Sequence, residues 1–231
     1  MAVELRAEAG TSAAAVPAQE FLHVSTEIAK RRFSARKDER GRFMPRHYNG
    51  VDSNLVGKKA FDHPAVHRWW KWLIRDYSPP YSIALLTPCS NIKPYTRSPT
   101  SRKVRAVLRR LNAWEDGKPK KVTWMYFSDL LIFVPYERAE EYPACCYEVH
   151  PDVVLRDKSL TELVVNITAR VLTALSRRGL EVVVTFLPSK HAKLWEQALA
   201  HAETVPEIIK TRYTLFSVFE LEETLKTILN N

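Results

Sequence analysis

The chain has 231 residues, 45% of them hydrophobic, and is therefore long enough to bury a core of its own. Its 35 Lys and Arg against 26 Asp and Glu leave a net charge of +9, which favours a polyanionic partner. Its three cysteines are too few for a disulfide framework and show no zinc-type spacing, and no apolar run is long enough to span a membrane. We expect a globular protein of a reducing, cytoplasmic compartment, with no metal or other cofactor.

The first 60 residues lack the pattern of a folded core. Residues 1–20 are Ala-rich and aperiodic, so we expect a flexible tail. Residues 21–60 form a basic arm, in which eight cations against two acids give +6 over 30–46. Arg31 and Arg32 are candidate RNA contacts there, since cations pair with phosphates and neighbouring aromatic rings stack on bases. A solvated arm without a ligand is the alternative.

Alternating strand and helix patterns predict an α/β core domain over 61–231. Apolar residues at helical spacing predict a helix over 66–77, and its tryptophans are expected in the core. The run from Ile83 to Leu86 predicts a buried strand. Ser159 and Glu162 have the spacing of a capping box, which predicts the start of the clearest helix. Further helices are expected over 102–114, from 189 and over 221–229, and further strands over 122–126, 130–134, 181–187 and 213–219. This alternation indicates a three-layer sandwich with a mostly parallel central sheet.

The loop after the first predicted strand, residues 87–101, concentrates reactive side chains. It holds the thiol of Cys89, the amine of Lys93 and the phenol of Tyr95 before a basic helix begins. Ligands of open α/β sheets bind outside the carboxyl ends of the strands, so this loop is the expected site. Asp129 follows another predicted strand and is expected at a similar position. An ordinary strand-to-helix connection is the alternative.

The helix predicted after this loop presents only cations on its outward face: Arg102, Lys103, Arg105, Arg109 and Arg110. A helix that needed only solubility would more often mix charges of both signs. We therefore expect this face, together with Arg97 of the loop, to contact an RNA backbone. The start of the helix also offers unpaired backbone N–H groups to a phosphate or carboxylate.

Two segments of the chain resemble archaeosine synthase, an archaeal tRNA-modifying enzyme family. The residues from Pro88 to Ser98 resemble the family signature P-C-S-x-x-K-P-Y-[ST]-x-S-x-x-H, with Ser101 in place of the final His. The segment from Val134 to Glu148 resembles the family's V-P-x-E-L-E-x-x-Y-P-x-x-x-Y-D with the same spacing. The resemblance extends over about residues 81–200 and implies a uracil-DNA-glycosylase-like α/β fold.

The resemblance also implies a reaction. The family adds the side-chain amine of free lysine to the nitrile of 7-cyano-7-deazaguanine in the D-loop of tRNA, forming an amidine adduct. A radical-SAM partner enzyme would then cleave the adduct to archaeosine. The family's transglycosylase-like barrel and RNA-binding PUA domain have no room in 231 residues. We therefore expect tRNA binding through the chain's own cationic surfaces or through separate tRNA-binding or transglycosylase proteins.

A nitrile substrate suggests roles for the candidate residues. Addition of an amine needs either a general acid at the nitrile nitrogen or a covalent thioimidate that the amine displaces. This chemistry predicts Cys89 as nucleophile and Lys93 as a group that stabilises charge or holds a substrate carboxylate. Tyr95 or Asp129 would supply or accept the proton. A buried strand-end thiol is the alternative for Cys89. The expected substrate-binding residues are Ser90, Tyr95, Ser98, Glu137 and Tyr147.

Two other functional classes fit parts of the sequence. The basic arm and the basic helix would suffice for a non-catalytic tRNA-binding subunit. A nucleobase glycosylase would also use a pocket for an extruded base. Such an enzyme should present a carboxylate that activates water, and the central loop contains none, so the glycosylase is the less favoured alternative.

Overall fold

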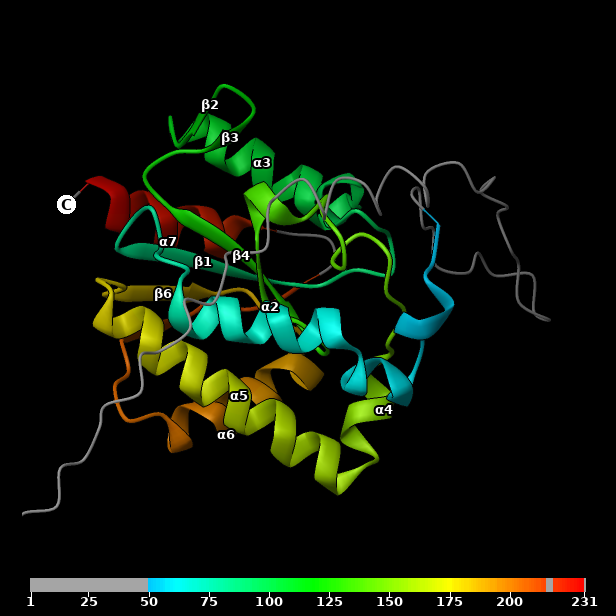
Figure 1. Cartoon of the computed structure of the whole chain (residues 1–231). Coiled ribbons are helices and arrows are strands. Elements are labelled where there is room, and N and C mark those ends of the chain that lie inside the picture. The colour runs from blue at the N-terminus through cyan, green and yellow to red at the C-terminus, as the bar shows by residue number, and fades with distance from the viewer. Residues whose placement is uncertain (1–49, 215–217, 231) are drawn as a thin grey trace, which may run out of the picture.

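A computed structural model describes residues 50–214 and 218–230 of the chain. The expected flexible tail and most of the basic arm, with Arg31 and Arg32, lie outside the described residues. A five-stranded sheet in the order β5-β4-β1-β6-β7 forms the centre (Figure 1). The strands are β1 Ile83–Pro88, β4 Thr123–Ser128, β5 Ile132–Pro135, β6 Val182–Thr185 and β7 Glu207–Lys210. All neighbours pair in parallel except β5, which is antiparallel to β4, so the expected mostly parallel sheet is confirmed.

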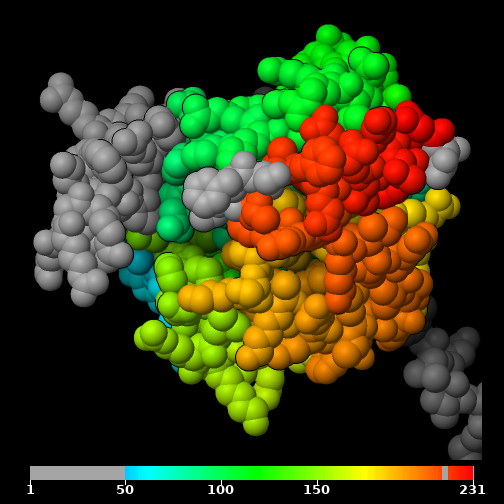
Figure 2. Space-filling view, turned by 180° about the vertical axis from the view of Figure 1, so that it is seen from behind, coloured from blue at the N-terminus to red at the C-terminus, as the bar shows by residue number. Residues whose placement is uncertain are grey.

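Helices flank the sheet on both faces. One face carries α2 (Pro64–Arg75), α5 (Lys158–Arg177) and α6 (Ser189–His201), and the other carries α3 (Pro99–Arg110) and α7 (Phe219–Asn230) (Figure 1). Figure 2 shows α7 beside the segment that contains the end of α3, where Arg110 and Glu222 form an ion pair. The short elements are α4 Pro151–Leu155, the hairpin strands β2 Trp114–Glu115 and β3 Lys118–Pro119, and the 3-10 turns η1 Ser53–Leu55, η2 Lys58–Asp62, η3 Tyr95–Arg97 and η4 Tyr136–Arg138.

The core follows from the apolar patterns of the sequence. Residues Ala84, Leu85 and Leu86 of β1 are fully buried because helices cover both faces of the sheet. Trp69 and Trp70 of α2 are also buried, and their indole N–H groups donate to backbone carbonyls at the β4–β5 connection and in β5. These hydrogen bonds satisfy the polar atoms of two large core side chains, so the prediction that they belong to the core is confirmed.

Most predicted boundaries are displaced by a few residues, and those of two helices have an identifiable local cause. Helix α3 begins at Pro99 because the Ser98 hydroxyl accepts from the N–H of Ser101, and it ends before Trp114, which lies in the hairpin. Helix α5 begins one residue before Ser159, with Asp157 as its cap, so the predicted capping box is wrong.

The last strand is also displaced from its predicted position. It is β7, whose alternation of exposed and half-buried residues suits the edge of the sheet. The prediction of a strand over 213–219 is wrong for the described residues in that range, since Tyr213 and Thr214 have no regular structure and Phe219 begins α7.

The described end of the expected basic arm packs on the core. Leu55 is fully buried, and its carbonyl accepts from the N–H of Glu148. The N–H of Asp52 donates to the carbonyl of Cys146. Residues 50–60 therefore contact the segment that follows β5. Among the described residues, no helix has both the length and the apolar character needed to cross a bilayer.

Candidate functional site

Three side chains meet where three adjacent strands end. Cys89 follows β1, Asp129 follows β4, and His191 lies in the first turn of α6, which follows β6. Because β1 lies between β4 and β6 in a parallel arrangement, their carboxyl ends open at the same edge. The N–H of Cys89 donates to the carbonyl of Phe127 and fixes the start of the loop against β4. The sheet therefore brings together residues up to 102 positions apart.

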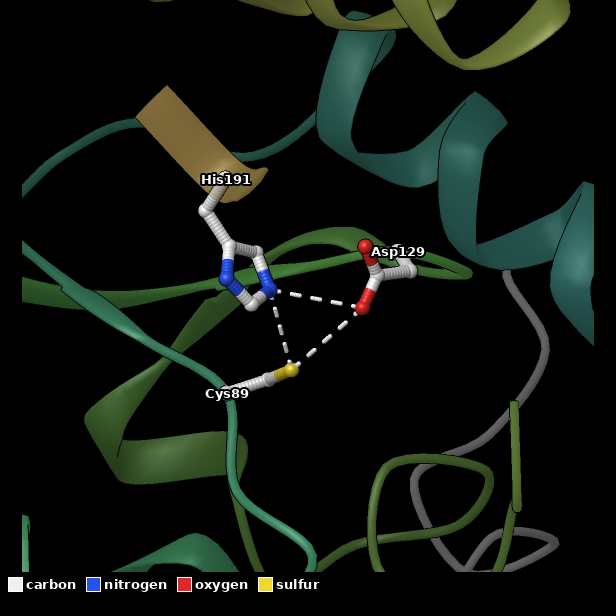
Figure 3. A group of neighbouring side chains, drawn as sticks. All are labelled: Cys89, Asp129 and His191. Atoms are coloured by element: carbon white, nitrogen blue, oxygen red, sulfur yellow. Dashed lines mark hydrogen bonds and ion pairs between the residues drawn. The ribbon is translucent and has the colours of Figure 1, made fainter. Parts of the chain in front are cut away.

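The three side chains form a nearly equilateral triangle, which we call the Cys–Asp–His cluster (Figure 3). Sγ of Cys89 lies 3.4 Å from Nε2 of His191 and 3.6 Å from Oδ2 of Asp129. The same Nε2 lies 3.3 Å from the same Oδ2. A nucleophile–base–orienter relay would place the carboxylate on the other ring nitrogen. Here Sγ and Oδ2 both lie close to Nε2 and to each other, so the three atoms could bind one metal ion between them.

The cluster is buried and attracts positive charge. Asp129 is 1% exposed and His191 is 5% exposed, whereas Cys89 is half-buried. Burial acts to lower the pKa of His191, but the charges and hydrogen bonds of Cys89 and Asp129 outweigh it and raise the pKa to about 10. Among the described residues, Oδ1 of Asp129 and Nδ1 of His191 have no hydrogen-bond partner. Two buried polar side chains, each with one unpaired atom, therefore lie beside the half-buried Cys89.

Lys93 extends the site from the same loop. Its ammonium nitrogen donates to the carbonyl of Ser90 at 3.4 Å and lies 4.2 Å from the ring centroid of Tyr147. Its side chain is buried, and burial lowers its pKa despite the opposing charges of Cys89 and neighbouring acids. A lysine in such a place more readily gives up its proton than a surface lysine.

A pair of buried tyrosines lies beside Lys93. The hydroxyls of Tyr95 and Tyr147 share a short hydrogen bond, and the Tyr147 hydroxyl also lies 2.6 Å from the hydroxyl of Ser128. Burial raises the pKa of both phenols well above the usual value, so both keep their protons. The loop after β1 and the irregular segment before α4 therefore meet at the same edge of the sheet.

The other expected substrate-binding residues have local structural contacts. The Ser90 hydroxyl accepts from the N–H of Ile92, and the Ser98 hydroxyl caps α3. Glu137 follows β5, whose antiparallel register carries it toward the edge opposite Cys89, and its carboxylate accepts from the hydroxyl of Tyr77. The structure thus brings Ser90 close to Lys93 but does not bring Glu137 to the cluster.

Ser101, which stands at the final His position of the archaeosine synthase signature, is part of the packing. Ser101 is 1% exposed, donates to the carbonyl of Tyr95 and hydrogen-bonds to the hydroxyl of Tyr126. His191 is the site residue that the sequence reasoning missed. The rule that ligands bind at strand ends would have pointed to it, because it lies just after the third parallel strand.

The expected RNA-binding cations lie on and around α3. Arg102, Arg105 and Arg109 line a groove of about 460 Å³ together with the rings of Trp114 and Tyr136. One guanidinium N–H of Arg105 donates to the carbonyl of Thr96, so this residue also supports the loop. Arg97 is exposed and Lys103 is half-buried. The groove combines cations with aromatic rings, as nucleic-acid surfaces do.

The fold and the cluster define a class: an α/β protein with a candidate catalytic or metal site at the carboxyl edge of a mostly parallel sheet. Residues 66–225 match the family described as "Domain of unknown function (DUF5591)", and the chain belongs to that family. It is similar to a solved structure titled "Crystal structure of AF0587, a protein of unknown function", with 20% identity and a TM-score of 0.46. That similarity covers 71% of this chain and 50% of the other, so the chain spans about half the length of that protein. No curated protein matches the chain.

Proposed function

We propose that the chain is a tRNA-modifying enzyme of the archaeosine synthase kind, which adds the side-chain amine of free lysine to the nitrile of 7-cyano-7-deazaguanine. The proposal rests on the resemblance of residues 88–98 and 134–148 to that family, and it includes a uracil-DNA-glycosylase-like form of the α/β fold. A mostly parallel sheet with helices on both faces is compatible with that form.

One observation carries the proposal. The two segments that resemble the family are separate in sequence, yet Lys93 and Tyr95 of the first contact Tyr147 of the second. Both segments lie beside the Cys–Asp–His cluster. Burial lowers the pKa of Lys93, and the charges of Cys89 and Asp129 oppose this shift. Part of each segment therefore lies at one place, as residues of a common active site would, whereas Glu137 of the second segment lies elsewhere.

The arrangement suits amine addition to a nitrile. In this reaction the amine nitrogen bonds to the nitrile carbon, and one proton passes from the amine to the nitrile nitrogen, which gives an amidine. Lys93, whose pKa is lowered by burial, is suited to accept the proton from the incoming amine. The cluster is suited to polarise the nitrile nitrogen, and the groove on α3 to bind the RNA backbone.

The test uses the full chain, tRNA that carries the cyano base, and isotopically labelled lysine. We expect label on the tRNA with the wild-type protein, and none on tRNA that carries guanine at the same position. If the protein binds both tRNAs but transfers no label, the chain is a passive binding subunit and the proposal is overturned. Release of a free base in place of transfer would identify a glycosylase and would also overturn it.

A further inference from the structure

The Cys–Asp–His cluster has the dimensions of a metal site. In a tetrahedral zinc site with bonds of roughly 2.3 Å to sulfur and about 2.0–2.1 Å to nitrogen and oxygen, the ligand atoms lie about 3.6 Å (S···N), 3.5 Å (S···O) and 3.3 Å (N···O) apart. The corresponding distances are 3.4 Å, 3.6 Å and 3.3 Å. Each edge of the triangle therefore agrees with tetrahedral geometry to within about 0.2 Å.

We propose that Cys89, Asp129 and His191 bind a divalent metal ion of the zinc class through Sγ, Oδ2 and Nε2, and that the fourth tetrahedral position is open. Thiolate, imidazole and carboxylate are all zinc ligands, and three protein ligands with one open position are typical of catalytic rather than structural zinc. The sequence showed no zinc-type spacing because the three ligands come from the ends of three different strands.

Hydrogen bonding alone does not account for the triangle. Nε2 carries at most one hydrogen, which lies in the ring plane along one direction and cannot be aimed at both Sγ and Oδ2. The 3.6 Å edge between Sγ and Oδ2 is the weakest of the three as a hydrogen bond. A metal ion at the centre of the three atoms satisfies all of them at once.

Burial and charge support the same assignment. Asp129 and His191 are almost fully buried, and Oδ1 of Asp129 has no hydrogen-bond partner among the described residues. A buried carboxylate that lacks donors is costly unless a cation compensates it. One thiolate and one carboxylate would balance the two positive charges of a divalent ion, which leaves the cluster neutral.

The open position determines what the metal can do. Cys89 is the half-buried member of the cluster and belongs to the loop that holds Lys93 and Tyr95, so we place the open position on the side of this loop. This role of the metal rests on the proposed function: the nitrile nitrogen would occupy the open position and be polarised there. The sulfur of Cys89 is then a ligand, and no thioimidate forms at it.

The first test is metal binding by the full chain, with no RNA present. We expect one Zn²⁺ per chain after dialysis against a low concentration of zinc. Replacement by Co²⁺ should give the intense visible bands of four-coordinate cobalt and a near-ultraviolet charge-transfer band from the thiolate. A wild-type protein that binds no zinc, or a cobalt protein without the thiolate band, would overturn the proposal.

Matched variants on one helix assign the ligand. His191→Gln should weaken zinc binding by more than about 100-fold, beyond the loss of an outer-shell partner. His201→Gln, at the exposed end of α6, should bind zinc as the wild type does. Circular dichroism checks that both fold, and equal affinities in two folded variants would contradict the assignment.

A measurement on the wild type needs no variant. Cys145 and Cys146 are fully buried, whereas Cys89 is half-buried, so a small alkylating agent should modify Cys89 first in the metal-free protein. Zinc should slow this alkylation at least tenfold, and a chelator should restore it. Equal alkylation rates with and without zinc would contradict ligation through Sγ.

The metal site and the proposed function can fail separately. Zinc binding without lysine transfer would retain the site and reject the function. Lysine transfer by a protein shown to be free of metal would retain the function and reject the polarising role of the metal. Trapping of a covalent adduct between Cys89 and cyano-modified RNA would overturn the role of the sulfur as a ligand.

Discussion

The ammonium nitrogen of Lys93 lies 4.2 Å from the ring centroid of Tyr147, a residue 54 positions later (147 − 93) in the second motif segment. This cation–π contact joins the two segments. Lys93 is only 4% exposed. Among the described residues Lys93 forms no ion pair, and a buried lysine without one is costly to the fold. This cost is compatible with the proton-transfer role proposed for it.

Lys93→Met should therefore separate function from stability. Methionine keeps most of the volume without the charge, so the variant should unfold at the same urea concentration as the wild type or a higher one. Lysine transfer to cyano-modified tRNA should fall by about 100-fold or more, as for loss of a general base. The exposed Lys226→Met on α7 is the control and should retain full transfer. Normal transfer by Lys93→Met would exclude Lys93 from the chemistry.

Ser101→His tests whether the final histidine of the archaeosine synthase signature fits this chain. The Ser101 side chain is enclosed by Ser98, Tyr95 and Tyr126, so a larger ring should destabilise the fold by about 1–3 kcal/mol through overpacking. Ser101→Ala, which only removes the hydroxyl, should cost about 1 kcal/mol. Urea denaturation measures both. A Ser101→His protein as stable as the wild type would show that the site has room for the histidine.

Single arginines of α3 should differ in their contribution to tRNA binding. Arg102 and Arg109 are exposed in the groove, so Arg102→Ala and Arg109→Ala should each weaken binding and lower the slope of log affinity against log salt by about 1. Arg110 on the same helix is engaged by both carboxylate oxygens of Glu222. Arg110→Ala is therefore the matched control and should leave the slope unchanged. Equal slopes for all three variants would place the RNA elsewhere.

Arg178 should contribute more to the stability of the fold than its neighbour Arg177 at the end of α5. Its guanidinium donates to the carbonyls of Leu73, Ile74, Arg75 and Tyr77, and so binds the end of α2. Loss of these bonds in Arg178→Ala should lower the free energy of unfolding by about 2 kcal/mol or more. Among the described residues, the neighbouring Arg177 pairs with Glu203 alone, and this ion pair is exposed, so Arg177→Ala should cost less than about 0.5 kcal/mol. Thermal or urea unfolding of both variants makes the comparison, and similar losses would contradict the capping role.

Local sequence patterns predict most of the helices and strands. The apolar spacing of α2 and the buried runs of β1 and β6 follow from side-chain periodicity, which is a property of neighbours in sequence. The predictions failed where a second residue could act as the helix cap or where a strand lacked an apolar run. Asp157 caps α5 in place of Ser159 because its carboxylate accepts from the N–H of Leu160, and β7 is an edge strand too polar to be recognised by its apolar run.

The sequence by itself determined a basic α/β chain whose reactive loop follows a central strand, because strand ends, turns and charge are encoded by adjacent residues. It also placed Cys89, Lys93 and Tyr95 together, since all three belong to one loop. The sequence also predicts Asp129 at this edge, but only the tertiary structure decided that His191 joins Cys89 and Asp129. Only the tertiary structure decided that Glu137 lies toward the opposite edge. The physical reason is that strand order and direction set which chain ends share an edge, and those depend on pairings between distant segments.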